Sequence, residues 1–279
     1  MLFQCEGKDT SSVRWDGREL AELYDRISDL QFEGGKKLAA RMGVKKGDAV
    51  LDVGCGTGRL AVHLAGVVGP AGSVRGIDPS PHRVRIAERK LKGQGTGNVR
   101  ARIGRGEDLG AFGAGEFDHV VYSSVFHWVA DKPAALGEAY RVLRAGGRVG
   151  MNTVDKDHHF AMKQIMQDLV AKKYPEHWPM EDAMSHMLVG GGQLRAMLEA
   201  AGFEGVKIET VPEKHIYASA NELFDFIEAS SFGNFMRDVP APVKSRLLED
   251  LGRELEKMRT PAGIELTSKM LFAVAGKPR

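Results

Sequence analysis

The sequence predicts an α/β fold in which short, mostly parallel strands alternate with helices that cover both faces of one sheet. Residues 48–152 alternate short β-branched segments with longer stretches of helical periodicity, as a βαβ succession requires. Glycine is frequent, at 34 of 279 residues, and its clusters mark the turns between these segments. Apolar residues make up 43% of the chain, which is enough to build a sizeable core.

Seven segments have the composition of strands. They lie at 49–53, 73–77, 99–103, 117–122, 148–153, 206–211 and 270–275. Apolar residues at helical spacing predict helices around 60–68, 84–91, 136–143 and 193–201, the first three followed closely by a glycine that can end the helix. The segment 107–115 is short and rich in glycine, so we expect a loop there and no crossover helix.

Two stretches interrupt the alternation and predict helical insertions that together form a cap over the carboxyl edge of the sheet. The first, 155–190, carries an apolar stripe at Met162, Ile165, Met166, Leu169 and Val170 before Tyr174-Pro175 stops the helix. The second, 213–262, opens a helix with the capping-box sequence Ser219-Ala220-Asn221-Glu222. The predicted order is a helical segment 1–44, a core 45–154, the insertion 155–190, a core helix and strand 191–212, the insertion 213–262, and a final strand within 263–279.

The charge balance and the absence of long apolar runs exclude several classes of protein. A formal net charge of +2 gives no broad basic surface for duplex nucleic acid. The run 60–74 is too short for a membrane span, and the N-terminus lacks a secretory signal. Two cysteines, Cys5 and Cys55, are too few for a disulfide framework. We expect a cytoplasmic protein with no nucleic-acid or membrane partner; the oligomeric state is not predicted.

The strongest motif is Val50-Leu51-Asp52-Val53-Gly54-Cys55-Gly56-Thr57-Gly58, a strand that runs directly into a glycine turn and a helix. Glycines at 54, 56 and 58 allow a tight bend and let a ligand approach the main chain. A dinucleotide fingerprint would place its third glycine where Arg59 stands, which argues against a bound pyrophosphate.

A carboxylate ends the second predicted strand, in the sequence Gly76-Ile77-Asp78-Pro79-Ser80. The two oxygens of Asp78 can accept hydrogen bonds from both hydroxyls of a ribose. Together with the glycine turn, Asp78 predicts a site for a nucleoside.

The order of these motifs resembles the class I S-adenosylmethionine-dependent methyltransferases over about residues 45–153. The resemblance implies a Rossmann-like, seven-stranded sheet and S-adenosylmethionine as the cofactor. It implies that the methionine moiety is surrounded by Asp52 and the turn residues Gly54, Cys55, Gly56 and Gly58. It also implies that Asp78, with Pro79 next to it, binds the ribose.

The remaining cofactor contacts are implied by the same resemblance. The turn 104–109 is similar to the loop that meets the adenine, with the N–H of Gly106 facing the base. Relatives often carry Asp where this chain has Arg105, so Glu107 or Asp108 is the substitute for a side-chain contact. Ser123 would line the methionine end. Tyr24 and Gln31 lie where an N-terminal helix often folds over the cofactor, although ordinary helix packing also explains them.

Catalysis of methyl transfer requires mainly that the acceptor be aligned with the methyl group and that water be excluded. His127, just after the fourth strand, is the candidate general base or acceptor-orienting group, and a structural histidine is the alternative. His158 and His159 lie beside Asp155 and Asp157, but Ser123-Ser124 stands where a metal-dependent relative needs a carboxylate. We therefore expect no metal.

The acceptor is expected to be a small molecule bound in an apolar pocket with contributions from Phe160, Trp178, Phe232 and Phe235. The C-terminal sequence and His127-Trp128 resemble the carboxyl-methylating branch typified by trans-aconitate and malonyl-carrier-protein methyltransferases, with Arg14 or Arg237 as a cationic anchor. Transfer to an oxygen, of a carboxylate or a hydroxyl, is therefore the prediction. The alternatives are N-methylation of a small amine and a non-catalytic module that binds S-adenosylmethionine or S-adenosylhomocysteine.

Overall fold

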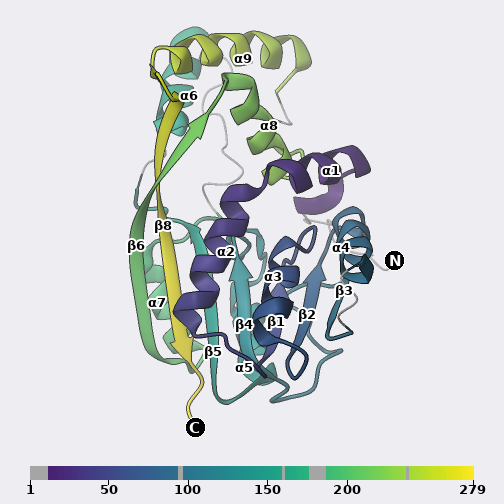
Figure 1. Ribbon diagram of the computed structural model, residues 1–279. Helices are drawn as coiled ribbons and strands as arrows, with labels where there is room; N and C mark the ends of the chain where they lie inside the picture. The colour runs from purple at the N-terminus through teal and green to yellow at the C-terminus, as the bar shows by residue number, and fades with distance from the viewer. Residues whose placement is uncertain (1–11, 94–96, 159–160, 176–186, 237–238) are drawn as a thin grey trace, which may run out of the picture.

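A single mixed sheet organises the chain in the computed structural model, which describes residues 12–93, 97–158, 161–175, 187–236 and 239–279. The strand order is β3-β2-β1-β4-β5-β8-β6, and a short strand, β7, pairs with β8. The strands are β1 (Ala49–Val53), β2 (Ser73–Asp78), β3 (Val99–Ile103), β4 (Phe117–Ser123), β5 (Leu143–Val154), β6 (Glu204–Tyr217), β7 (Arg259–Thr260) and β8 (Gly263–Gly276). Strands β1 to β5 pair in parallel and β8 runs against them, which confirms the predicted Rossmann-like fold (Figure 1).

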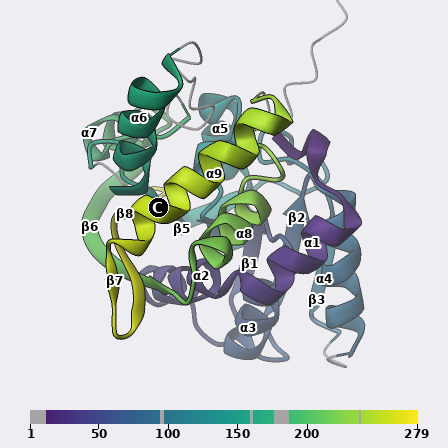
Figure 2. The same cartoon turned by 90° about the horizontal axis from the view of Figure 1, so that it is seen from above.

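Helices cover both faces of the sheet, as predicted (Figures 1 and 2). On one face lie α2 (Asp29–Met42), α3 (Arg59–Val68) and α4 (Pro81–Gly93), and on the other lie α5 (Lys132–Val142) and α7 (Gly191–Ala200). Successive residues of a strand point to opposite faces. Val50 accordingly packs with Leu64 in one buried cluster, while Leu51 packs with Leu136 in the other.

Among the described residues, three helices form the cap above the carboxyl ends of the parallel strands (Figures 1 and 2): α6 (Ala161–Lys173), α8 (Ala220–Ser230) and α9 (Ala241–Glu256). They share a separate apolar cluster that includes Met166, Leu223 and Leu251. The predicted capping box begins α8, because the Ser219 hydroxyl accepts a hydrogen bond from the Glu222 N–H. The N-terminal helix α1 (Arg18–Ile27) lies beside α8 and α4.

Three strands are longer in the structure than the sequence predicted. The strand predicted at 148–153 begins at Leu143, and those predicted at 206–211 and 270–275 extend through β6 and β8. Beyond β5, residues 212–217 of β6 still pair with residues 264–269 of β8. Two antiparallel strands exchange hydrogen bonds with each other without a third neighbour, so this pair continues past the sheet and reaches the cap. The expected start of the second insertion, residue 213, therefore lies inside β6.

The loop expected at 107–115 is confirmed, since no helix joins β3 to β4. In the part of the chain that the structure describes, no helix is long and apolar enough to cross a membrane.

Strand β1 pairs with β2 on one side and with β4 on the other, so the order in which the strands follow one another reverses at β1. In open α/β sheets, ligands bind at the carboxyl ends of the strands at such a switch point. Asp52, Asp78 and Ser123 come from the carboxyl ends of β1, β2 and β4. The topology therefore places three predicted site residues in one crevice.

Candidate active site

The glycine turn after β1 has a left-handed backbone at all three glycines, with φ of 73° at Gly54, 53° at Gly56 and 82° at Gly58. Gly56 donates its N–H to Asp78 Oδ2 at 2.9 Å. A Cβ on Gly58 would lie 2.9 Å from the Cβ of Ala87, so this glycine allows α4 to pack against the start of α3. Of the three, Gly54 borders the open space beside the turn.

Two hollows meet at Gly54, and they divide the predicted cofactor residues between them. The first, here called the Asp78 hollow, is bordered by Asp78, Pro79, Gly106 and Glu107, together with Val125, Trp128 and Phe232. The second, the Asp52 hollow, is bordered by Tyr24, Gln31, Asp52, Cys55 and Ser123, together with Thr57 and Arg59. The structure thus brings together nearly all the residues expected at the cofactor, and it places Gly56 and Gly58 behind the two hollows.

Three residues of the Asp52 hollow carry a buried oxygen atom with no hydrogen-bond partner in the described part of the chain: Gln31 Oε1, Asp52 Oδ2 and Ser123 Oγ. An amide oxygen and a carboxylate oxygen only accept hydrogen bonds. Leaving such groups buried and unpaired costs about 1–3 kcal/mol each. The hollow therefore suits a ligand with several N–H donors, such as an ammonium group.

The charges around the Asp52 hollow are of both signs. Burial, together with the nearby Asp78 carboxylate, raises the pKa of Asp52 to about 7. The guanidinium of Arg59 also borders the hollow, where it donates to the Asp29 carboxylate and lies 4.8 Å from the ring centroid of Phe32. A ligand that carries both an ammonium and a carboxylate matches this pair of charges.

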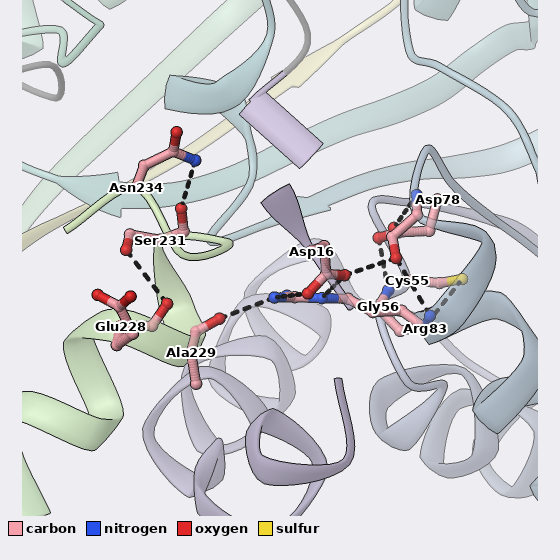
Figure 3. Close-up of polar contacts among 10 residues, drawn as sticks. Asp16, Cys55, Gly56, Asp78, Arg83, Glu228, Ala229, Ser231 and Asn234 are labelled. Carbon is pink, nitrogen blue, oxygen red and sulfur yellow. Dashed lines mark hydrogen bonds and ion pairs between the residues drawn. The ribbon is translucent and has the colours of Figure 1, made fainter. Parts of the chain in front are cut away.

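In the Asp78 hollow, both carboxylate oxygens of Asp78 already accept a backbone hydrogen bond (Figure 3). Oδ2 accepts from Gly56 and Oδ1 accepts from Ser80, each at 2.9 Å. Because a carboxylate has about four acceptor positions, Asp78 keeps capacity for two hydroxyl donors. Burial raises the pKa of Asp78, and the positive charge of Arg83 opposes this effect.

The turn after β3 supplies the rest of the Asp78 hollow. A Cβ on Gly106 would lie 3.1 Å from Val53 Cγ1 and 3.3 Å from the Tyr122 ring, so only glycine fits without displacement. Glu107 borders the hollow while its Oε1 accepts the Ala130 N–H at 2.9 Å. Asp108 turns away and accepts the Gly110 N–H, so Glu107 is the acid that remains a candidate for an adenine contact.

Val125 lies where the two hollows meet. A Cβ built on Gly54 would be 2.2 Å from Val125 Cγ2, so the valine side chain packs directly on the glycine. The preceding residue, Ser124, has a φ of 56°, which is uncommon for a residue with a side chain. We therefore expect a ligand that lies across Gly54 to displace Val125.

His127 is buried in the short 3-10 turn η2 (Phe126–Trp128) that follows β4. Its Nδ1 forms a hydrogen bond with Thr153 Oγ1 at 3.0 Å, and it borders neither hollow. Burial, with a smaller contribution from the positive charge of Lys132, lowers the pKa of His127 to about 3. The imidazole is therefore neutral at physiological pH.

Other predicted residues are spread more widely. Phe232 borders the Asp78 hollow and Phe235 packs in the cap, whereas Arg14 is exposed and stacks on Trp15. His158 Nδ1 pairs with Asp155 Oδ2 at 2.7 Å. Within the described residues, no three His, Cys, Asp or Glu side chains are placed to hold a metal ion. Outside the described residues lie Cys5, His159, Phe160, Trp178 and Arg237.

Several residues that border the hollows were not predicted as ligand contacts, among them Arg59, Val125 and Trp128, and Phe232 was expected only in the acceptor pocket. Arg59 follows the glycine turn directly, and its charge in that place was a usable signal. Trp128 and Phe232 form an edge-to-face pair with ring centroids 5.3 Å apart, although they are far apart in the sequence. Their meeting depends on the placement of the cap, which local sequence patterns do not encode.

Comparison with known proteins agrees with this geometry. The family model described as a methyltransferase domain matches residues 44–202, more than half of the chain. A demethylmenaquinone methyltransferase of Geobacillus kaustophilus is 31% identical over 208 residues, which are 68% of this chain and 88% of that protein. The enzyme of the same name from Geobacillus stearothermophilus is 31% identical over 203 residues, 67% of this chain and 86% of that protein.

Among solved structures, the phosphoethanolamine N-methyltransferase 2 of Haemonchus contortus in complex with S-adenosyl-L-methionine superimposes with a TM-score of 0.61 at 17% identity. The match covers 94% of this chain and 58% of that one, and it shows a shared fold. The family match and the identity to the Geobacillus enzymes go further. The chain is a class I S-adenosylmethionine-dependent methyltransferase, an enzyme of the methyltransferase-domain family with S-adenosylmethionine as its cofactor.

Proposed function

We propose that this enzyme transfers a methyl group to a small, largely apolar acceptor, with the cofactor lying across Gly54. The amino-acid end then occupies the Asp52 hollow, and the ribose lies against Asp78. The observation that carries this placement is the group of three unpartnered oxygens of Gln31, Asp52 and Ser123, one hollow away from a carboxylate with free acceptor capacity.

When bound, S-adenosylmethionine supplies an electrophilic methyl group on a sulfonium. The chain supplies the contacts that hold it in place. Asp52, Gln31 and Ser123 would accept hydrogen bonds from the ammonium, and Arg59, which pairs with Asp29 in the free protein, would hold the ligand carboxylate. Tyr24 and Cys55 form the walls of this end.

The nucleoside end is held by a second group of residues. Asp78 accepts from the ribose hydroxyls, with Pro79 beside it, while Gly106 and Glu107 border the adenine. Trp128 and Phe232 cover this end and exclude water, which favours transfer to the acceptor over hydrolysis. Alignment and exclusion of water are the main contributions that the protein makes to this reaction.

For the acceptor, we propose an uncharged ring of the quinone class, methylated in its reduced hydroquinone form. The cap contributes partly buried aromatic side chains, among them Phe224 and Phe235, which suit an apolar ring. Arg14, one of two anchors considered for a carboxylate acceptor, lies exposed on Trp15. Relatives with 31% identity are named for demethylmenaquinone, a quinone. These points favour a ring carbon as the methylated atom, with the adjacent oxygen as the competing position.

His127 has an orienting role in this proposal. A neutral imidazole with a pKa of about 3 is a poor proton acceptor, but the ring lies 5.1 Å from that of Trp128, centroid to centroid, and so positions a residue that borders the Asp78 hollow. Its Nδ1 is held by Thr153, which fixes the direction of the ring.

The proposal is tested by methyl transfer from tritium-labelled S-adenosylmethionine to four acceptors of similar size: a chemically reduced naphthoquinone, a phenol, a dicarboxylate and a primary amine. We expect the reduced naphthoquinone to become labelled, with the new methyl on carbon as seen by NMR. Label on the amine or the dicarboxylate alone would overturn the proposed acceptor class. Tight binding of S-adenosylhomocysteine without transfer to any acceptor would favour the non-catalytic module.

A further inference from the structure

Arg83, on the first turn of α4, joins three segments that are distant in the sequence. Its guanidinium is buried, with 3% of the side chain exposed, and its Nε lies 3.0 Å from Asp16 Oδ2. Nη2 donates to the carbonyl oxygen of Ala229, near the end of α8, at 2.7 Å. Figure 3 shows the Arg83 guanidinium beside Asp16, with a hydrogen bond that reaches Ala229 in the cap. The side chain therefore connects the cap and residues 12–27, here called the N-terminal segment, to the core.

Two aromatic rings enclose the same guanidinium. The Cζ atom of Arg83 lies 4.1 Å from the ring centroid of Tyr24 and 3.9 Å from that of Phe232. Tyr24 borders the Asp52 hollow and Phe232 borders the Asp78 hollow. One guanidinium thus supports a wall of each hollow from behind. Phe232 also has a φ of 56°, a conformation that needs support from its surroundings.

Hydrogen bonds continue from Arg83 to the residue that holds the ribose in the proposed function. Asp16 Oδ2 accepts from the Ser80 hydroxyl at 2.5 Å, and the Ser80 N–H donates to Asp78 Oδ1 at 2.9 Å. The path therefore runs from Ala229 in the cap through Arg83, Asp16 and Ser80 to Asp78. Movement of the cap or of the N-terminal segment is coupled by these contacts to the position of the Asp78 carboxylate.

We propose that Arg83 and Asp16 form a latch that holds the N-terminal segment and the cap closed over the cofactor, and so controls how slowly the cofactor leaves. This inference rests on the proposed placement of the cofactor across Gly54. A buried ion pair is weak support for stability, because apolar residues of similar volume often replace one without loss. The planar fork of arginine, however, binds a carboxylate and a carbonyl while it stacks between two rings, and lysine cannot do all three.

The test is the substitution Arg83→Lys, with Arg89→Lys as the matched control, since Arg89 is an exposed arginine on the same helix. Binding of S-adenosylhomocysteine is measured by calorimetry, and its dissociation rate by stopped flow, below the unfolding transition of each variant. We expect Arg83→Lys to weaken binding at least tenfold, mainly through faster dissociation, and Arg89→Lys to bind as the wild type does. Asp16→Asn, which keeps the side-chain shape, should have a similar effect, and the double variant should be little worse than either single one.

A purely structural role predicts a different result, namely a lower melting temperature with unchanged affinity and dissociation rate in Arg83→Lys and Asp16→Asn. That result would overturn the latch. The variant Asp78→Asn distinguishes this failure from failure of the proposed cofactor placement. If Asp78→Asn binds S-adenosylhomocysteine normally, the placement is wrong; if it binds weakly while both latch variants bind normally, the latch alone is wrong.

Discussion

Asp52 is the residue whose environment fits its proposed role most closely. It lies one residue before the end of β1 with 1% of its surface exposed, and its Oδ2 has no hydrogen-bond partner among the described residues. Desolvation and the neighbouring Asp78 both disfavour its charged form. A bound ammonium would supply the missing donor and favour the ionised carboxylate. The binding of the cofactor and the ionisation of Asp52 are therefore linked.

This linkage predicts that cofactor affinity falls as the pH is lowered. The pKa of Asp52 in the free protein is about 7, so below that value a proton must leave before the ammonium can pair with the carboxylate. Between pH 7.5 and pH 5.5, we expect the affinity for S-adenosylhomocysteine to fall roughly twentyfold, as measured by calorimetry.

Few titratable groups interact with the Asp52 carboxylate, so a variant of Asp52 is a clear control for the pH dependence. Asp78 faces it from β2, and Tyr24 and Cys55 are electrostatically coupled to it. Asp52→Asn should bind weakly at both pH values and lose most of the pH dependence. An equally steep pH profile in Asp52→Asn would assign the titration to Asp78 instead.

At the scale of elements, the glycine turn has two functions that the sequence motif does not separate. Gly54 borders both hollows, while Gly58 makes room for α4 against the start of α3. The spacing of the glycines predicted a ligand turn, but it gave no means to assign one glycine to the ligand and another to helix packing. That division depends on which helix lies behind the turn.

The packing function of Gly58 predicts an effect on stability. In Gly58→Ala, the new Cβ would lie 3.1 Å from the backbone Cα of Ala87, and φ is 82°. We expect this variant to lower the free energy of unfolding by about 2–4 kcal/mol, from strain and overpacking together. Gly43→Ala is the matched control, because Gly43 has the same left-handed backbone (φ 72°, ψ 33°) and its new Cβ meets only the end of the Arg148 side chain, at 3.3 Å.

Urea unfolding of the two variants distinguishes backbone strain from the close contact with Ala87. Gly43→Ala should lower the free energy of unfolding only by the cost of a left-handed alanine, about 1 kcal/mol. If Gly58→Ala is as stable as Gly43→Ala, the close packing of α4 on the turn is not a constraint. The difference in the free energy of unfolding between the two variants measures the effect of packing α4 against Gly58.

For the molecule as a whole, much of the fold could be predicted because local patterns determine it. Strands β1 to β4 and helices α3 and α4 follow from β-branched runs, helical periodicity and glycine stops. The boundaries of β6 and β8 could not be predicted, because beyond Val211 the strands pair mainly with each other, and their sequence lacks the continuous apolar run of a central strand.

The candidate site divides in the same way. Residues next to the motifs, such as Asp52, Asp78 and Gly106, were found from the sequence, and they lie where the strand order reverses. Phe232 beside Trp128, and Arg83 between Tyr24 and Phe232, depend on how the cap and the N-terminal segment meet the core. Such contacts join distant segments, so no local pattern indicates them.

The placement of the cofactor across Gly54 is tested most directly by a crystal structure of the enzyme with S-adenosylhomocysteine bound. We predict that its ammonium lies among Asp52, Gln31 and Ser123, that its ribose hydroxyls donate to Asp78, and that Val125 has left its position on Gly54. A ligand found elsewhere, or bound while Val125 still packs on Gly54, would contradict the account.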